Sequence, residues 1–392
     1  MASPSASLPR WVEPNALCPS LPVFCLDGIL SGLPDDDADV RAFSAAVADC
    51  LRRTSLLVVR DPRVREEDNE RFLDQMERYF DQPTELKMQD VRADLCYQVG
   101  ATPEGTEVPR AAAPGDALLA STLAAAASPP DRPTPPRGAD AKWRFFWRAG
   151  ARPASTSFPE LNAAPVVPAS FPRWAEVMDG WAGSLVGAAE AAVQAAALGL
   201  GLPRDALLAR MRGGPHLLAP TGSDLLAHDA PGTVLAGFHV DLNLLTVHGK
   251  SRFSGLRVWT SFDQEEPTGD ALPFSSSPSL RAFRHVLVPR VPPGCLLMQA
   301  GLQFEALTGG VVAAGPHEVL VTPDAVAAAR ARAAEGLPAW RVSSTLFAHV
   351  ASDQVLEPLG GLGGEDAKTR YPAEPAGAQV QRELKAIALS KS

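Results

Sequence analysis

The sequence has little cysteine and no excess of positive charge. Its 392 residues contain five cysteines, an odd number with no CxxC pair, which argues against a disulfide framework or a cysteine-based zinc site and favours a reducing compartment. The formal net charge is −9 and the sequence pI is about 5.4. A nucleic-acid or anionic-membrane partner requires a basic footprint, so we expect neither.

Long hydrophobic runs are also missing. The most apolar stretch, residues 188–200, contains Glu190 and Gln194, which argues against a membrane-spanning helix. The first 24 residues have no apolar core of signal-peptide length. We therefore expect a cytoplasmic protein, with a short organelle transit peptide as the open alternative. The sequence gives no indication of the oligomeric state.

The order of elements predicts an α+β fold with a β-rich core. Strand and helix patterns alternate early in the chain, a long helix is expected over 171–203 with a shorter one over 203–214, and short strands between Gly and Pro turns follow, which favours a sandwich or barrel. The regions are 20–110 (N-terminal), 111–141 (an extended Ala/Pro-rich loop), 142–214 (helical support), 215–352 (the strand-rich core) and 353–392 (a C-terminal loop and helix that covers the barrel opening or mediates a dimer contact).

The segment "GFHVDLNLLTV" suggests a metal site. His239 and Asp241 are two residues apart at the start of an apolar run, and residues i and i+2 of a strand point to the same face. A third ligand would complete a site of two histidines and one carboxylate, which leaves open positions on Fe(II). His317 in "GPHEVLVT" opens another predicted strand and is the best candidate.

A second pair suggests an anion site. Arg341 and Ser343 in "WRVSS" again have i, i+2 spacing in an apolar strand. A guanidinium beside a hydroxyl is suited to hold a carboxylate, and a buried arginine without an anionic partner would be costly. We therefore expect a carboxylate-bearing molecule there.

These motifs together resemble those of the isopenicillin N synthase-like branch of the 2-oxoglutarate/Fe(II)-dependent dioxygenases. The resemblance rests on "HVDLNLLTV", "PPGCLLMQAGLQFEALTGG", the later histidine and "RVS", in that order. It implies a distorted double-stranded β-helix (jelly-roll) with flanking helices. It also implies Fe(II) held by His239, Asp241 and His317, and 2-oxoglutarate held by Arg341 and Ser343. The implied reaction hydroxylates or desaturates a small molecule with O₂, releasing succinate and CO₂.

The sequence departs from that family at three places. The Asn-Tyr-Tyr-Pro stretch that helps hold the cosubstrate is replaced within "GPHLLAPTGSD" (215–224), where His216 or Thr221 could stand in for the lost contacts. Residues 261–284 lengthen the core, and a helical insert is expected over 322–338. Some relatives work without 2-oxoglutarate, with direct oxidation or ascorbate. A 2-oxoglutarate-independent Fe(II) oxidase and a catalytically silent ligand-binding barrel therefore remain alternatives.

Further residues are candidates for substrate contact. "YQVGATPEGTEVPR" (97–110) resembles a segment of a plant and algal branch of the family and could be a plain surface loop or line the pocket mouth, which makes Tyr97 and Arg110 candidates. His216 and His248 are others, although a structural histidine is the simpler interpretation of His248. "KWRFFWR" (142–148) is interpreted as a packed aromatic cluster in preference to a pocket wall.

Overall fold

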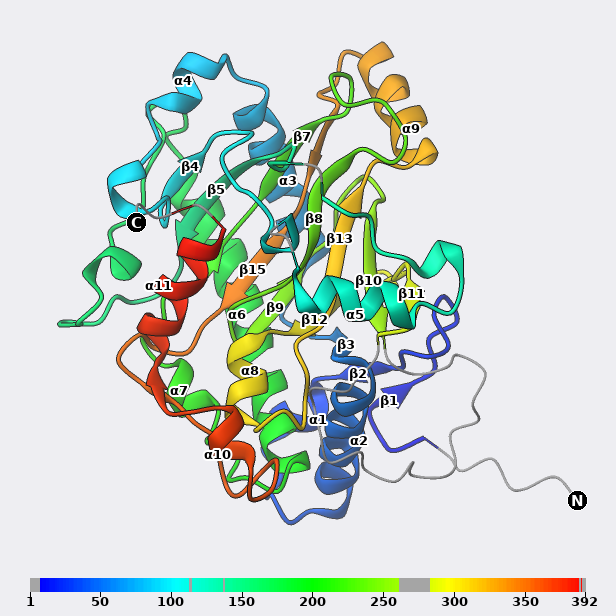
Figure 1. Ribbon diagram of the computed structural model, residues 1–392, viewed down its shortest axis with the longest axis vertical. Coiled ribbons are helices and arrows are strands. Elements are labelled where there is room, and N and C mark those ends of the chain that lie inside the picture. Colours follow the sequence, from blue (N-terminus) through cyan, green and yellow to red (C-terminus); the bar gives the residue numbers. More distant parts are fainter. Residues whose placement is uncertain (1–7, 113–114, 137, 261–282, 388, 390–392) are drawn as a thin grey trace, which may run out of the picture.

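The computed structural model describes residues 8–112, 115–136, 138–260, 283–387 and 389. It is a mixed α+β structure in which helices flank β-sheets (Figure 1). This agrees with the predicted α+β class and its flanking helices. None of the helices in the described part is long and apolar enough to cross a membrane.

The larger sheet has eleven strands and includes the N-terminal strands. Ten of them lie in the order β1 (Val12–Glu13), β2 (Val23–Cys25), β3 (Leu56–Arg60), β12 (Cys295–Ala300), β9 (Leu245–His248), β15 (Thr345–Ala348), β6 (Leu217–Leu218), β5 (Trp143–Arg148), β7 (Thr221–Asp224) and β14 (Trp340–Val342), and β4 (Gly100–Thr102) pairs with β5. The pair β2–β3 is parallel. Because β3 pairs with β12, the N-terminal part of the chain extends the same sheet as the core.

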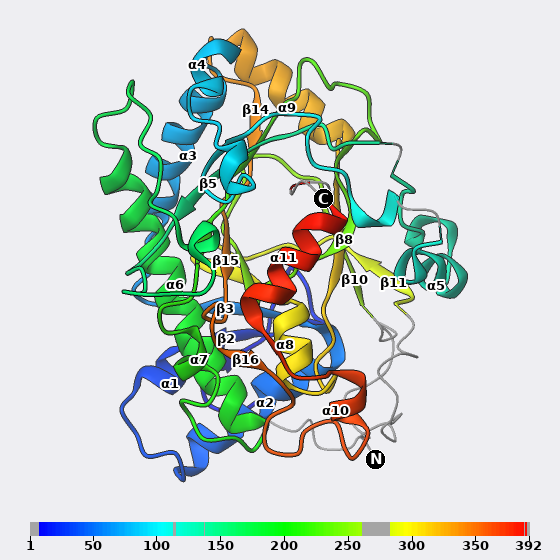
Figure 2. The same cartoon turned by 60° about the vertical axis from the view of Figure 1, so that its left-hand side comes forward.

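The smaller sheet has four strands, in the order β11 (His285–Leu287), β10 (Leu256–Thr260), β13 (Pro316–Leu320) and β8 (Val234–Val240). Figure 2 shows β8, β10 and β11 on one side of the molecule and β15, β3 and β2 on the other. The two sheets therefore face each other across the interior.

Helices cover the outer face of the larger sheet. The long helix α6 (Trp174–Gly199) packs on α2 (Ala38–Thr54), on α3 (Glu66–Phe80) and on strands β6, β9 and β15. Its buried face is built largely from alanines, which favour a helix and let neighbours approach closely. The side chain of Asp37 caps α2 by accepting hydrogen bonds from two backbone N–H groups. This layer fixes the sheet that forms one wall of the interior.

Two predicted segments differ from the structure. The segment 111–141, expected to be an extended loop, contains α5 (Ala117–Ala125). The side chain of Asp116 caps this helix, and Leu118 and Leu119 pack against a cluster around Trp259. Capping and packing therefore stabilise a helix although the composition is typical of a loop. The expected helix over 203–214 is reduced to α7 (Leu208–Met211).

The helical insert expected over 322–338 is confirmed as α9 (Pro323–Ala334). Residues 261–282 of the predicted 261–284 insertion lie outside the described residues.

The remaining elements are α1 (Asp27–Leu30), α4 (Thr84–Met88), α8 (Leu302–Leu307), α10 (Ala367–Arg370), α11 (Ala376–Ala386), β16 (Val355–Leu356), β17 (Glu374–Pro375) and the 3-10 turns η1 (Ala93–Leu95), η2 (Arg110–Ala112), η3 (Pro129–Asp131) and η4 (Pro159–Asn162).

Candidate metal centre and its cavity

A cavity of about 830 Å³ lies between the two sheets. Its walls come from strands of both sheets, and Glu383 and Leu384 of α11 also line it. Figure 2 shows α11 in front of the space between the sheets. The C-terminal helix thus covers this side of the cavity, one of the two roles considered for it. A cavity of this size is typical of a small-molecule site.

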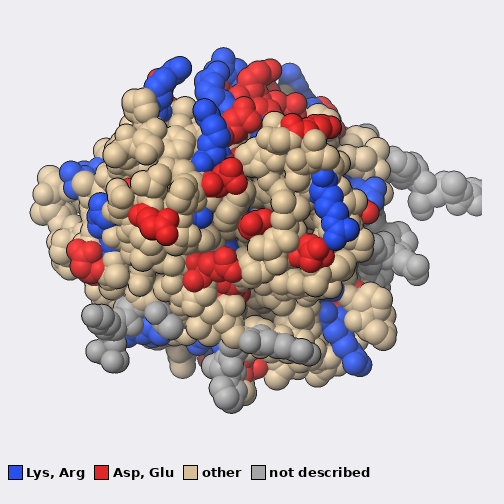
Figure 3. Space-filling model, turned by 90° about the horizontal axis from the view of Figure 1, so that it is seen from above, with Lys and Arg blue, Asp and Glu red and all other residues tan. Residues whose placement is uncertain are grey.

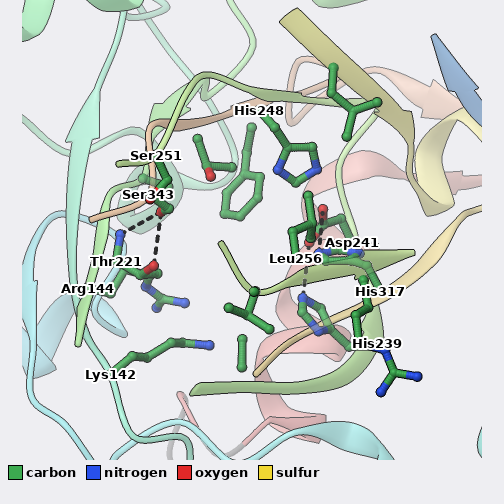
Figure 4. Close-up of a pocket in the computed structure, with 18 of the residues that line it drawn as sticks. Lys142, Arg144, Thr221, His239, Asp241, His248, Ser251, Leu256, His317 and Ser343 are labelled. Atoms are coloured by element: carbon green, nitrogen blue, oxygen red, sulfur yellow. Dashed lines mark hydrogen bonds and ion pairs between the residues drawn. The ribbon is translucent and has the colours of Figure 1, made fainter. Parts of the chain in front are cut away.

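Three of the predicted residues meet in the cavity. His239 near the end of β8 is the register partner of His317 on β13, and Asp241 follows β8 directly. The two sequence-distant histidines are therefore neighbours because their strands pair. His239, Asp241 and His317 each offer a ligand atom, and these atoms all lie within 4.8 Å of one another. The side chains converge on one point in Figure 4.

Hydrogen bonds orient these side chains. Nδ1 of His239 lies 2.6 Å from the carbonyl oxygen of Gly237 and donates to it, which leaves Nε2 unprotonated in the neutral ring. That Nε2 lies 3.5 Å from Oδ1 of Asp241, and Nε2 of His317 lies 3.7 Å from Oδ2. The Thr246 hydroxyl donates to Oδ2 at 2.6 Å. Such second contacts hold metal ligands in place.

The charges of the three groups complement one another. Burial opposes ionisation of Asp241, but the two histidines and the Thr246 hydroxyl outweigh it and lower the pKa of its carboxyl group. Burial, together with repulsion from His239, lowers the pKa of His317 to about 3. Burial also disfavours the charged form of His239, but its hydrogen bond and attraction to Asp241 raise its pKa. At neutral pH the cluster holds an ionised carboxylate beside a neutral His317 imidazole.

The donor set fits a divalent first-row metal. Two imidazole nitrogens and one carboxylate oxygen are the ligands of facial Fe(II) sites, which leave coordination positions open. All three residues are held by strands or their ends, so the arrangement exists before a metal binds. These three side chains could therefore hold Fe(II).

Arg341 is a buried cation facing the same cavity. It is 6% exposed and lines the cavity wall. Its Nε donates a 2.9 Å hydrogen bond to the carbonyl oxygen of Ser254, and no carboxylate of the described residues forms an ion pair with it. Burial alone lowers the pKa of its guanidinium to about 10. The group stays charged at neutral pH, and the described part of the chain supplies it with no anion.

Ser343 lies two residues further on, beside Thr221. The Ser343 hydroxyl accepts a 2.9 Å hydrogen bond from the backbone N–H of Thr221 and lies 3.0 Å from the Thr221 hydroxyl; Figure 4 draws both contacts. Each of the two hydroxyls has one proton, and only one of these protons is used in the contact between them. The other proton remains available to donate to a ligand. Thr221 and Ser343 thus present two neighbouring hydroxyls to the cavity.

The four candidate substrate residues divide into two pairs. Arg110 and His248 line the cavity; Arg110 forms a 2.6 Å ion pair with Glu383 of α11, and Nε2 of His248 lies 3.3 Å from Oε1 of Gln299. His216 and Tyr97 do not line it. Nδ1 of His216 accepts a hydrogen bond from the backbone of His349, and Tyr97 packs in an apolar cluster beside α11.

Sequence reasoning missed the charged residues of β5. Trp143, Phe145 and Trp147 are core residues, so the packed-cluster interpretation holds for one face of the strand. The opposite face bears Arg144 and Phe146, which line the cavity together with Lys142, the residue before the strand. The alternation of charged and aromatic residues in "KWRFFWR" is the signal that could have revealed two different environments.

The described residues on the face drawn in Figure 3 form no large patch of a single charge sign. There Lys and Arg side chains alternate with Asp and Glu, in keeping with the net charge of −9.

Comparison with known proteins shows which solved structures have a similar fold. No family model and no curated protein matches the chain. Among solved structures, a protein from Caulobacter crescentus described as 2OG-Fe(II) oxygenase family has a TM-score of 0.65 at 21% identity, over 93% of this chain and 98% of that one. A full-length Neurospora crassa protein, solved in complex with alpha-KG and thymine, gives 0.64 at 15% identity over 94% and 97%. The chain has the fold of these two proteins.

A third structure shares this fold. JOX2, solved in complex with 2OG, Fe and JA, has a TM-score of 0.59 at 17% identity, and the match covers 98% of this chain and 92% of that one. Because the matches span nearly the whole of each chain, the likeness extends beyond the strands of the core.

Proposed function

We propose that the protein is an Fe(II)- and 2-oxoglutarate-dependent dioxygenase that hydroxylates or desaturates a small molecule. Its core, residues 215–352, would be the distorted jelly-roll of the isopenicillin N synthase-like branch. The observation that carries the proposal is the presence, in one cavity, of a three-ligand metal cluster and a buried arginine that has no anionic partner among the described residues. Two of the similar structures contain 2OG or alpha-KG, which supports the choice of cosubstrate.

Each residue has a part in this proposal. His239, Asp241 and His317 would hold Fe(II), and Arg341 with the hydroxyls of Ser343 and Thr221 would bind the distal carboxylate of 2-oxoglutarate. Bound Fe(II) with 2-oxoglutarate and O₂ would supply the oxidising power, and the cosubstrate would leave as succinate and CO₂. Strands of both sheets form the walls of the site, and α11 covers one side.

The test is anaerobic calorimetry of the Mn(II)-loaded protein with 2-oxoglutarate. We expect saturable binding in the wild type, no metal binding in His317→Ala, and at least about a tenfold loss of 2-oxoglutarate affinity in Arg341→Gln, because a hydrogen-bonded charge pair contributes about 1.5–3 kcal/mol. Arg148→Gln is the matched control. Arg148 is also a buried arginine, but it bonds to backbone carbonyls and is absent from the cavity wall.

The alternatives give different results in the same experiment. Metal binding without 2-oxoglutarate binding would contradict the cosubstrate and favour the Fe(II) oxidase. Absence of metal binding would contradict the enzyme proposal and leave a ligand-binding barrel.

A further inference from the structure

Arg144 and Lys142 form a second pair of basic side chains on the cavity wall, where Glu107 and Asp140 balance their charge. Arg144 of β5 is the register partner of Thr221 of β7, whose hydroxyl contacts Ser343. Lys142 precedes Arg144 by two residues and lies on the same face. Figure 4 shows both long side chains reaching into the cavity from the wall opposite His239 and His317.

The guanidinium of Arg144 has unused donors. The residue is 5% exposed, and Nη1 donates a 2.8 Å hydrogen bond to Glu107. Nε and Nη2 are buried and have no hydrogen-bond partner among the described residues. These two groups form the edge of the guanidinium with parallel N–H bonds, which matches the two oxygens of a carboxylate. Buried donors without acceptors cost free energy until a ligand satisfies them.

Glu107 and Asp140 hold the two cations in place. Lys142 Nζ lies 2.6 Å from Asp140 and 3.5 Å from Glu107. The other Asp140 oxygen accepts a 2.9 Å hydrogen bond from the backbone N–H of Gly237 on β8, two residues before His239. The cluster therefore ties β5 to the strand that carries the metal ligands and keeps Arg144 fixed beside the proposed reaction centre.

Apolar side chains surround this position. Phe146, Leu217 and Ala219 form one buried cluster with Phe347 packed against it, and all four line the cavity. The Arg144 guanidinium lies 3.9 Å from the centre of the Phe146 ring, a cation–π contact that holds it against the wall. A ligand bound there would meet a cation and a hydrophobic surface together.

We propose that Arg144, supported by Lys142, binds a carboxylate of the substrate, so that the substrate is a small organic acid with an apolar body. This rests on the proposed function. Arg144 lies beside Thr221 of β7, but β7 separates it from Arg341 of β14, and two strand spacings amount to roughly 9.6 Å. The two guanidinium groups are therefore separate anchors. Arg341 would then hold one carboxylate, and Arg144 another.

The test compares a charged probe with a neutral one of equal size. The protein is loaded with Mn(II), saturated with 2-oxoglutarate without O₂, and titrated with 4-phenylbutanoate or 4-phenylbutanamide, and broadening of the probe's proton NMR signals by the bound Mn(II) measures binding near the metal. We expect the acid to bind at least about tenfold more tightly than the amide. Arg144→Gln should remove this preference, and Arg144→Lys should keep part of it.

Two controls accompany the titration. Arg148→Gln removes a buried arginine from the same strand outside the cavity and should leave the preference intact. Calorimetry of Arg144→Gln should show 2-oxoglutarate affinity within about twofold of the wild type, and this also shows that the variant is folded. Lys142 remains beside Glu107 in this variant, so the carboxylate keeps a cationic partner.

Four results would overturn the proposal: no acid binding in the wild type, equal binding of acid and amide, a preference that persists in Arg144→Gln, or loss of 2-oxoglutarate affinity in Arg144→Gln, which would assign Arg144 to the cosubstrate. A wild type that fails to bind Mn(II) or 2-oxoglutarate in calorimetry would instead overturn the proposed function itself.

Discussion

The hydroxyl of Thr246 donates a 2.6 Å hydrogen bond to Oδ2 of Asp241, and both residues are buried. Because this bond orients the carboxylate, Thr246→Val should weaken Mn(II) binding by about 10–100-fold while changing the side-chain shape little. Calorimetry measures the affinity. Thr260→Val is the matched control, since Thr260 is equally buried on β10 and its hydroxyl has no partner in the described part of the chain. Equal metal affinity in the two variants would contradict the role of Thr246.

Thr221 is expected to affect the cosubstrate without affecting the metal. Its hydroxyl lies 3.0 Å from that of Ser343, so Thr221→Val removes one of the two hydroxyls available to a carboxylate. We expect 2-oxoglutarate affinity to fall about tenfold and Mn(II) affinity to stay the same in calorimetry. Ser223→Ala is the control, because this hydroxyl, two residues further along β7, donates to the backbone of Ala141. An unchanged 2-oxoglutarate affinity in Thr221→Val would contradict the proposal that the Thr221 hydroxyl contributes to cosubstrate binding.

Two glycines of α6 should respond to alanine in opposite directions. A Cβ at Gly199 would overlap the carbonyl oxygen of Ser44 in α2, whereas a Cβ at Gly183 would meet nothing within 4 Å. Gly199→Ala should therefore lower the free energy of unfolding by about 2 kcal/mol or more, and Gly183→Ala should raise it by about 1 kcal/mol. Urea unfolding measures both. If Gly199→Ala left the free energy of unfolding unchanged, α2 and α6 would be free to move apart and the prediction would be wrong.

Acid should destabilise the protein through His216. Burial, with repulsion from Arg148, lowers the pKa of His216 to about 4, while an unfolded histidine titrates near 6.5. The unfolded state therefore binds the proton first, and stability present above pH 6.5 is lost as the pH falls towards 4. This histidine alone should account for about 2 kcal/mol of the loss between pH 7 and pH 5.

Urea unfolding of His216→Gln at several pH values tests this contribution. Its stability should fall less between pH 7 and pH 5 than that of the wild type. His228→Gln is the control, because His228 is partly exposed and contacts Glu104 at the surface. A pH dependence of His216→Gln identical to that of the wild type would contradict the prediction.

The local geometry of the site follows from the sequence alone. The i, i+2 spacing of His239 and Asp241 places both near one spot, because alternate residues of an extended chain share a face. The same rule applies to Arg341 and Ser343. The apolar runs predicted the core strands, and the pattern of 322–338 predicted α9, since periodicity and turn residues act over a few residues.

Which distant residues meet depends on the tertiary structure. The pairing of β8 with β13 brings His317 opposite His239, and the pairing of β5 with β7 sets Arg144 beside Thr221. His216 lies five residues before Thr221 in the sequence, yet it bonds to His349 and lies outside the cavity wall. Strand pairing and burial depend on contacts between remote segments, and a local sequence pattern does not specify which segments will pair.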